Sequence, residues 1–503
     1  MAVRTDRAGR VRPYLLAAGL ASVPLAVQTI QAYWSKDVWF HSASILELSS
    51  HPFDPNHPTA SAAVGDPELS PFPLLWGLVH RVTGAGLFTV LVVAGLVNLV
   101  LFWSALWAFT SRVTRARLAP ALAVPAVLLV WGIDPWRWSG YPNLNSLGFG
   151  LPYPSVAALA GYLVALTLLL GWLREPRWSR AWAIGAIGVV VTLMHPITGA
   201  ALGLGAAALV VTAAARAGDR SRAVFVQLAV AALLALGVVL MWPFYSFGEL
   251  LRGADAYTDI NAGVLRQVLP RAALGLACFP VAVLLARRRG DWRLVALALP
   301  PLVLVAAGLA IDVPVLGRFL PFGLLPLQIA FADAVAGAVP ASAPLRRTRL
   351  AAGLAMATVG LVGVAAALPR MVPEPLLPAS LRDDDRFVSA RDEAGAVAHL
   401  DADMVVIAPE REVARPVLAS GAKLVDPLYP APELDDAEAR ERAVAQFLQV
   451  IPSRRAEIVR TYGATHLVVG KGLSARIDVD EFGTVEWNGS SVVVRLCTQM
   501  PDC

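Results

Sequence analysis

The sequence predicts an α-helical polytopic membrane protein of about eleven spans with a small C-terminal α/β domain. Of its 503 residues, 57% are hydrophobic and only 16% are charged. Soluble domains have about 45–50% apolar and about 25% charged residues, so both values differ from the soluble range in the same direction. The stretches 85–109 and 181–215 are almost unbroken apolar runs, each at least as long as the roughly 20 residues that cross a bilayer. A soluble enzyme, a fibrous protein and a disordered scaffold are therefore excluded.

The predicted spans follow the apolar runs. We place them at 13–34, 85–109, 119–133, 155–173, 181–195, 197–215, 223–245, 271–286, 294–311, 319–338 and 350–370. Arginine clusters occupy the N-terminus and every second loop. Short arginine-rich loops mark the cytoplasmic side of a membrane protein, so a multi-pass protein of the cell membrane is predicted, with a cytoplasmic N-terminus and an extracytoplasmic C-terminus. The pI of 9.3 is then a signal of topology, and no nucleic-acid partner is expected.

Two domains are predicted, a transmembrane domain at 1–370 and an extracytoplasmic domain at 371–503. A proline-rich linker at 373–378 opens the second domain, and the charge content rises after it. Its apolar runs at 404–408, 466–469 and 491–496 are typical of buried strands, and 435–450 is typical of a helix with an acidic start. In the transmembrane domain, the outer loop 35–72 is long and acidic, and 68–82 is predicted to be an amphipathic helix.

A chemically suggestive motif, Asp37-Val-Trp-Phe-His41, follows the first span directly. A carboxylate at the membrane surface with a histidine four residues later suits general-base catalysis on an acceptor hydroxyl. A helix here would place Asp37 and His41 on one face. The alternative is an interfacial aromatic belt, with Trp39 in it, beside a solvated acid.

This motif resembles those of the GT-C class of membrane glycosyltransferases, which take a sugar from a polyprenyl-phosphate carrier outside the cytoplasm. The stretch at 37–41 is similar to the acid-Pro-Trp-Phe stretch of oligosaccharyltransferase catalytic subunits. It is also similar to the acid-x-x-aromatic-His stretch of mannosyltransferases that use polyprenyl-phosphomannose. The long first outer loop, the many spans and the outer C-terminal domain agree with the class. It includes the actinobacterial mannosyl- and arabinofuranosyltransferases of cell-wall biogenesis, and no single member stands out.

The resemblance implies an inverting transfer to a cell-envelope glycan or glycolipid acceptor. Asp37 would deprotonate the acceptor hydroxyl, and His41 would orient Asp37 or bind a sugar. Membrane lipids would surround the spans, and an apolar groove would hold the prenyl chain. Arg318, in a short outer loop, matches the late-loop arginine that binds the carrier's phosphate. Its alternatives are lipid headgroups or Asp312, and Arg266 is a weaker phosphate-binding candidate.

The second outer loop, 134–154, is expected to bind substrate. Trp and Tyr faces pack on sugar rings, and Asn and Asp side chains bind sugar hydroxyls, although an aromatic belt has the same composition. With Trp39, the predicted substrate-binding residues are Asp134, Trp136, Trp138, Tyr141, Asn143, Asn145 and His195. His195 lies between two spans, where it would orient a substrate or cap a broken helix.

Asp66 and Glu68 form an acidic pair in the first outer loop. Class members that use a divalent metal place such pairs there, so the resemblance implies Mg²⁺ or Mn²⁺ at these carboxylates. Asp66-Pro67 is also ordinary turn chemistry, and many members of the class need no metal.

Two other functions fit the same pattern. One is a transporter or flippase of a lipid-linked envelope intermediate, and the other is a non-catalytic scaffold of an envelope-synthesis complex. The sequence leaves open the sugar, the acceptor, the linkage and the oligomeric state.

Overall fold

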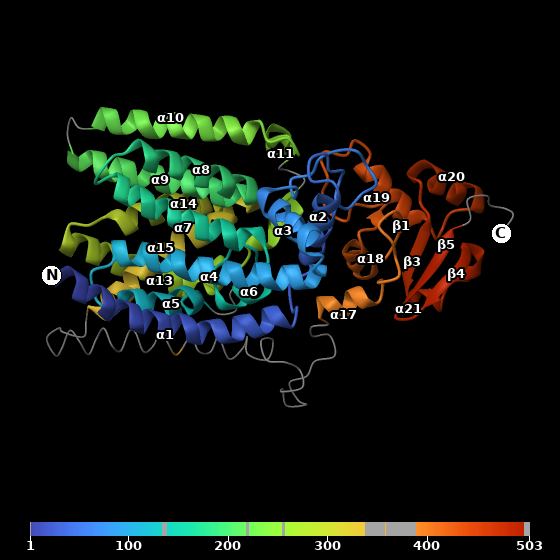
Figure 1. Cartoon of the computed structure of the whole chain (residues 1–503), viewed down its shortest axis with the longest axis horizontal. Coiled ribbons are helices and arrows are strands. Elements are labelled where there is room, and N and C mark those ends of the chain that lie inside the picture. Colours follow the sequence, from blue (N-terminus) through green and yellow to red (C-terminus); the bar gives the residue numbers. More distant parts are fainter. Residues whose placement is uncertain are drawn as a thin grey trace. The chain divides into compact units, whose positions relative to one another are not determined.

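A computed structural model describes residues 2–132, 138–217, 221–253, 257–337, 358 and 389–496. The chain divides into two compact units (Figure 1). The first comprises Met1–Gln31, Val93–Val239 and Thr258–Phe387. The second comprises Ala32–Val92, Leu240–Tyr257 and Val388–Cys503. This division differs from the predicted split after residue 370, because the first outer loop packs with the C-terminal residues.

The first unit is built of helices. Their bounds, including the parts of α4 and α10 that belong to the second unit, are α1 Ala2–Ile30, α4 Leu87–Val113, α5 Ala119–Leu129, α6 Leu144–Gly150, α7 Pro154–Trp172, α8 Trp178–Met194, α9 Pro196–Ala217, α10 Ser221–Leu240, α12 Thr258–Leu265, α13 Val268–Arg289, α14 Arg293–Ile311, the 3₁₀ helix η3 Pro314–Phe319 and α15 Leu320–Ala336. The predicted spans from 13–34 to 319–338 all fall on these helices, and 350–370 lies outside the described residues except for residue 358.

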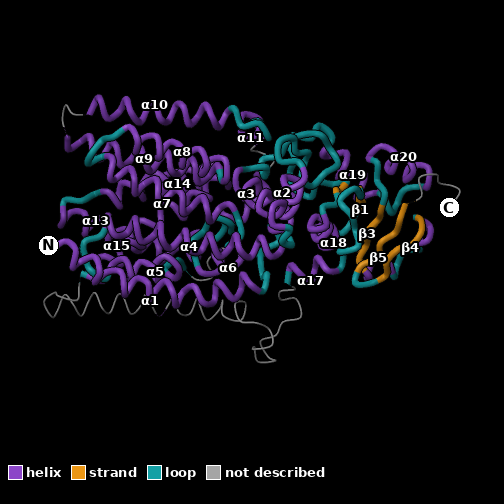
Figure 2. The backbone as a smooth tube through the Cα atoms, viewed as in Figure 1, coloured by secondary structure: helices purple, strands orange, loops and turns teal. Residues whose placement is uncertain are grey.

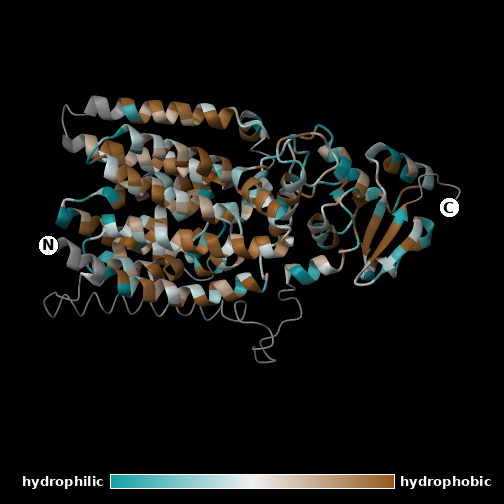
Figure 3. Cartoon of the chain, viewed as in Figure 1, coloured by the Kyte–Doolittle hydropathy of each residue, from teal (hydrophilic) through white to brown (hydrophobic). Residues whose placement is uncertain are grey.

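Seven helical segments of the described chain are long and apolar enough to cross a membrane. Three others, Ala119–Leu129, Trp178–Met194 and Val226–Leu240, are apolar but shorter. Apolar residues run along these helices, as Figure 3 shows. The observed architecture is therefore that of a helical membrane protein.

Helix α15 lies at the centre of the first unit and packs against α5, α13 and α14. Its buried Asp333 pairs with Arg289 of α13 and accepts hydrogen bonds from the backbone N–H groups of Ala116, at 2.8 Å, and Arg115, at 3.2 Å. A buried charge is tolerated when it is paired and hydrogen-bonded in this way. Asp333 therefore joins neighbouring elements of the helical core.

The second unit combines short helices with one sheet (Figure 2). Its helices are α2 Val38–Ser50, α3 Pro71–Thr83, α11 Phe247–Arg252, α17 Ala390–Gly395, α18 Arg411–Val417, η6 Leu418–Ser420, α19 Ala437–Gln446, α20 Pro452–Tyr462, α21 Lys471–Ser474 and η7 Val479–Glu481. Helix α3 confirms the amphipathic helix predicted at 68–82, and α19 confirms the helix predicted at 435–450. Gly77 lets α3 approach α2 closely, because a Cβ there would lie 2.9 Å from the carbonyl oxygen of Ile45.

The sheet has five strands, β1 Val405–Ile407, β2 Lys423–Leu424, β3 His466–Gly470, β4 Gly483–Asn488 and β5 Ser491–Leu496. Their order is β2-β1-β3-β5-β4. Strand β1 pairs in parallel with β2 and β3, whereas β5 pairs antiparallel with β3 and β4. The three predicted strands correspond to β1, β3 and β5, and the sequence did not predict β2 and β4.

The first outer loop joins the edge of this sheet. Ala60 forms a parallel bridge with Leu424 of edge strand β2. The backbone N–H of Leu424 donates to the carbonyl oxygen of Thr59 at 2.7 Å. The loop and the C-terminal residues therefore form one structural unit.

Candidate functional site

Asp37 lies at the N-cap of α2, directly after the loop that follows α1. Its side chain makes no hydrogen bond to the helix N-terminus. The Tyr429 hydroxyl instead donates to its Oδ1 at 2.9 Å, and within the described part of the chain Oδ2 has no hydrogen-bond partner. The Tyr429 ring also packs on Phe40, with 4.1 Å between ring centroids. One carboxylate oxygen of Asp37 is thus held, and the other can accept a proton from a substrate.

His41 lies one turn further along α2. Its Nδ1 is 3.0 Å from Oε2 of Glu68, whose side chain is 43% exposed. Burial opposes ionisation of Glu68, but the His41 ring outweighs that effect, so the pKa of Glu68 is lowered. Asp37 is the N-cap of α2 and His41 lies one turn later, which agrees with the prediction that the two residues share a helix face. The ring of His41 is paired with Glu68, however, and this partner was not predicted.

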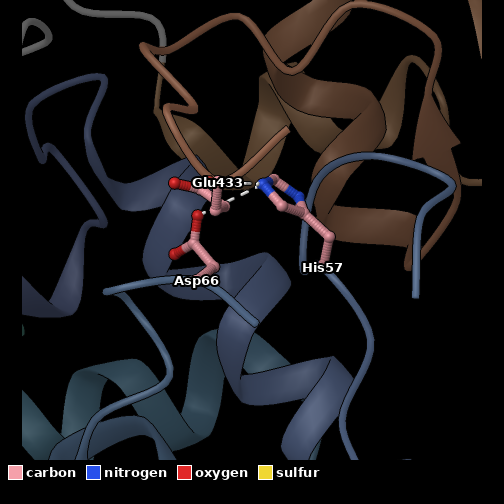
Figure 4. A group of neighbouring side chains, drawn as sticks. All are labelled: His57, Asp66 and Glu433. Carbon is pink, nitrogen blue, oxygen red and sulfur yellow. Dashed lines mark hydrogen bonds and ion pairs between the residues drawn. The ribbon is translucent and has the colours of Figure 1, made fainter. Parts of the chain in front are cut away.

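A second polar cluster consists of His57, Asp66 and Glu433 (Figure 4). Nε2 of His57 lies 3.3 Å from Oδ2 of Asp66 and 3.1 Å from Oε1 of Glu433. Asp66 Oδ1 also accepts the backbone N–H of Glu68 at 2.6 Å. Burial and the nearby carboxylate of Glu433 raise the pKa of Asp66 well above its usual range. The ligand atoms of the three residues lie within 4.8 Å of one another, which is close enough to share a metal ion.

The hydrogen bonds of His57 argue against a metal there. Its Nδ1 accepts the backbone N–H groups of Ala60, at 3.0 Å, and Thr59, at 3.3 Å. Nε2 of the neutral ring must then carry the proton, because a neutral imidazole has one donor and one acceptor. A metal-bound histidine needs the opposite arrangement, with its second nitrogen donating. We therefore assign the cluster as a hydrogen-bonded histidine and two carboxyl groups, Asp66 and Glu433.

The Mg²⁺ or Mn²⁺ expectation for Asp66 and Glu68 does not fit these contacts. The Asp66 carboxylate lies against His57, and that of Glu68 lies against His41. Each carboxylate has its own histidine partner, so the two form no shared pair of metal ligands. The described residues therefore favour a hydrogen-bonding role for both carboxylates.

A buried ion pair lies beside this cluster. Lys423 Nζ is 2.7 Å from Oε2 of Glu47 and donates to the carbonyl oxygens of His57, at 2.9 Å, and Pro58, at 3.0 Å. Glu47 Oε1 accepts the backbone N–H of Asn56 at 2.8 Å. Burial alone would raise the pKa of Glu47, but Lys423 and the hydrogen bonds lower it. These contacts fix the turn that carries His57.

In the first unit, three of the predicted residues come together. The Arg318 guanidinium lies over the Trp138 ring, 5.1 Å from its centroid, and donates to the carbonyl oxygen of Ser139 at 3.1 Å. Tyr141 is buried, and its hydroxyl donates to the carbonyl oxygen of Gly317 at 3.1 Å. The second outer loop is thus joined to η3, the 3₁₀ helix that carries Arg318.

Other predicted substrate contacts have structural roles. Asn143 is fully buried and caps α6 by accepting the backbone N–H of Ser146 at 2.9 Å. Nδ1 of His195 accepts the N–H of Thr198 at 3.3 Å, which caps the first turn of α9. Trp39 is 1% exposed. Burial and capping therefore account for Asn143, His195 and Trp39 without a substrate.

For the remaining predicted residues, the structure gives only burial or exposure, or does not describe them. Asn145 is buried, at 5% exposure. Arg266 is exposed and has no hydrogen-bond or ion-pair partner among the described residues. Asp134 and Trp136 lie outside the described residues.

Sequence reasoning missed the C-terminal contributors Lys423, Tyr429 and Glu433. Two signals were available. Lysine is rare in this arginine-rich chain, and Lys423 is one of only three lysines. Tyr429 and Glu433 lie in a stretch that contains three prolines between 427 and 432, which is typical of a rigid segment.

No known family model matches the chain, and no curated protein is significantly similar to it. Solved structures do match. Arabinofuranosyltransferase AftD from mycobacteria aligns with a TM-score of 0.53 and 17% identity, over 96% of this chain and 40% of AftD. The chain has a GT-C-like fold. The archaeal oligosaccharyltransferase AglB from Archaeoglobus fulgidus, in complex with an inhibitory peptide and a dolichol-phosphate, has a TM-score of 0.47 and 12% identity, over 91% of this chain and 69% of AglB. The chain thus spans about two fifths of the length of AftD. Along the chain, Asp37 follows the first candidate membrane span, Gly9–Ile30.

Proposed function

We propose that the chain is a membrane glycosyltransferase that moves a sugar from a polyprenyl-phosphate donor to a cell-envelope glycan or glycolipid. The observation that carries this proposal is Asp37, a carboxylate placed just after the first candidate span with Oδ1 held by Tyr429. The GT-C-like fold shared with AftD supports it. The arginine-rich short loops support an extracytoplasmic location for the second unit.

In the proposed reaction, Asp37 Oδ2 takes the proton of the acceptor hydroxyl. The hydroxyl oxygen then attacks the anomeric carbon from the side opposite the phosphate. The bond between that carbon and the phosphate oxygen breaks, its electron pair leaves with the phosphate, and the configuration inverts. Glu68 beside His41 can bind the hydroxyls of a sugar, because a carboxylate accepts hydrogen bonds on both oxygens.

We assign the donor phosphate to Arg318 of the first unit. A guanidinium binds phosphate through two parallel hydrogen bonds, and contact with Trp138 and Ser139 orders this side chain. Neutralising the departing phosphate would stabilise the transition state. Arg266 is exposed and is the weaker candidate.

The test is a transfer assay on purified protein in nanodiscs. Polyprenyl-phosphate arabinofuranose is offered first, because AftD is an arabinofuranosyltransferase, followed by the mannose and glucose donors. Acceptors are envelope glycolipids and oligosaccharides, and the readouts are released polyprenyl phosphate and the new glycosidic bond. Asp37→Asn should lower turnover by about 10²–10⁴-fold. Asp54→Asn, an exposed acid of the same loop, is the matched control and should retain full activity.

Other outcomes would contradict the proposal. Full activity of Asp37→Asn would place the base elsewhere. Translocation of donor without a new bond would indicate a flippase. Failure to bind any donor would indicate a scaffold.

A further inference from the structure

One C-terminal segment, residues 425–434, reaches the start of α2. Its Tyr429 provides the hydrogen bond to Asp37 Oδ1, at 2.9 Å, and the ring contact to Phe40. The sequence separation is 392 residues. Residues far apart in the chain are thus joined at the carboxylate that we propose as the base.

The backbone of this segment is restrained on both sides of Tyr429. Pro427 and Pro430 flank Leu428 and Tyr429 and fix the backbone φ of the two flanking positions. Leu428 has a φ of +66°, a left-handed conformation that is uncommon for a leucine. Asp426 Oδ1 accepts the N–H of Leu428 at 2.9 Å and stabilises this turn. Backbone strain of this kind occurs at functional sites, where the surrounding structure holds it.

The Tyr429 hydroxyl remains a donor over the working range of an enzyme. Burial and the carboxylate of Asp37 raise its pKa far above the usual value for tyrosine. A neutral phenol beside a carboxylate donates a hydrogen bond to the carboxylate and accepts none from it. Asp37 has no other side-chain hydrogen bond within the described residues, so this contact alone fixes the rotation of its carboxylate.

We propose that Tyr429 is a positioning residue for Asp37, so that the C-terminal domain completes the catalytic site. This inference rests on the proposed glycosyltransferase function. With Oδ1 held, Oδ2 keeps one orientation toward the incoming hydroxyl. Without the Tyr429 hydroxyl the carboxylate rotates freely, because the terminal torsion of aspartate is broad. A loss of orientation reduces turnover more than it reduces substrate binding.

The test compares Tyr429→Phe with wild type in the transfer assay. Phenylalanine keeps the ring on Phe40 and removes only the hydroxyl. We expect kcat to fall by about 10–100-fold, the effect of one hydrogen bond to a charged group. KM for the acceptor should stay at its wild-type value, and the midpoint of thermal unfolding should fall by only a few degrees, the cost of one lost hydrogen bond. Tyr462→Phe is the matched control, because the Tyr462 ring contacts Arg440 elsewhere in the same unit.

Replacing Tyr429 with 4-aminophenylalanine restores a donor at the same place and should recover most of the lost kcat. The inference is overturned if Tyr429→Phe is as active as wild type while Asp37→Asn is inactive. It is also overturned if kcat falls only together with the unfolding midpoint and the amino analogue restores neither. Wild-type protein that transfers no sugar would overturn both this inference and the proposed function. An active Asp37→Asn would overturn both the choice of base and the role of Tyr429.

Discussion

Replacing Lys423 with methionine tests whether a buried ion pair holds the first outer loop to the C-terminal residues. The Lys423 side chain is 16% exposed, and that of its partner Glu47 is 5% exposed. Methionine keeps most of the apolar stem and removes the charge together with three hydrogen bonds. The carboxylate of Glu47 would then remain buried with the backbone N–H of Asn56 as its nearest donor.

Removing one partner of a buried ion pair costs about 3–5 kcal/mol of unfolding free energy. We expect about 3 kcal/mol for Lys423→Met, because Asn56 still contacts Glu47. In a unit of roughly 200 residues each kcal/mol lowers the unfolding midpoint by about 2–4 °C, so the expected decrease is about 6–12 °C. The folded-state pKa of Glu47 is lowered. The contribution of the pair is therefore present above the ordinary glutamate pKa and is lost as the pH falls through the folded-state value.

The assay is thermal unfolding in nanodiscs, followed by hydrogen exchange at residues 56–60. A double variant, Glu47→Leu with Lys423→Met, removes both charges and should be more stable than Lys423→Met alone. Some loss should remain, because the carbonyl oxygens of His57 and Pro58 lose their donor. The reasoning is refuted if the stability losses of Glu47→Leu and Lys423→Met, each measured alone, add up to the loss in the double variant, because independent residues give additive effects.

Three further predictions follow from buried polar groups. Asp66→Asn should raise the unfolding midpoint of the second unit at neutral pH, because burial and Glu433 raise the pKa of Asp66 and so oppose its ionisation. This gain should vanish toward acidic pH, and an equal gain at all pH values would contradict the prediction. Asn143→Ala should cost about 1 kcal/mol of stability through loss of a helix cap, whereas Asn143→Ser should keep both stability and transfer activity. An Asn143→Ser protein that is stable but inactive would instead indicate that Asn143 contacts a sugar. Asp333→Asn should lower the free energy of unfolding in detergent by about 3–5 kcal/mol, because Arg289 loses its buried partner. An unchanged unfolding midpoint would show that this ion pair does not stabilise the helical bundle.

Features set by local sequence could be predicted. The spans follow from uninterrupted apolar runs, and β1, β3 and β5 follow from short buried runs. The shared helix face of Asp37 and His41 needs only a spacing of four residues. Strand β2 has two residues and β4 has mostly exposed positions, so neither carries a clear periodic pattern.

The partners of the candidate site could not be predicted in the same way. Tyr429, Lys423 and Glu433 meet the first outer loop only through tertiary folding, across more than 360 residues of chain. Composition also cannot distinguish an interfacial tryptophan from a buried one, which is why Trp39 was expected to bind substrate. The cap at Asn143 was accessible, because asparagine is a favoured N-cap residue.

The bridge between Ala60 and Leu424 has a consequence for any attempt to express the C-terminal domain alone. Strand β2 is the outermost strand on its side of the sheet, and the outer loop supplies its neighbouring backbone. Cutting the chain before residue 389 would leave that row of N–H and C=O groups open, with Lys423 deprived of its carboxylate. An uncovered strand edge pairs readily with another copy of itself. The first outer loop therefore protects the C-terminal domain, which follows it by more than 300 residues, against self-association through this strand edge.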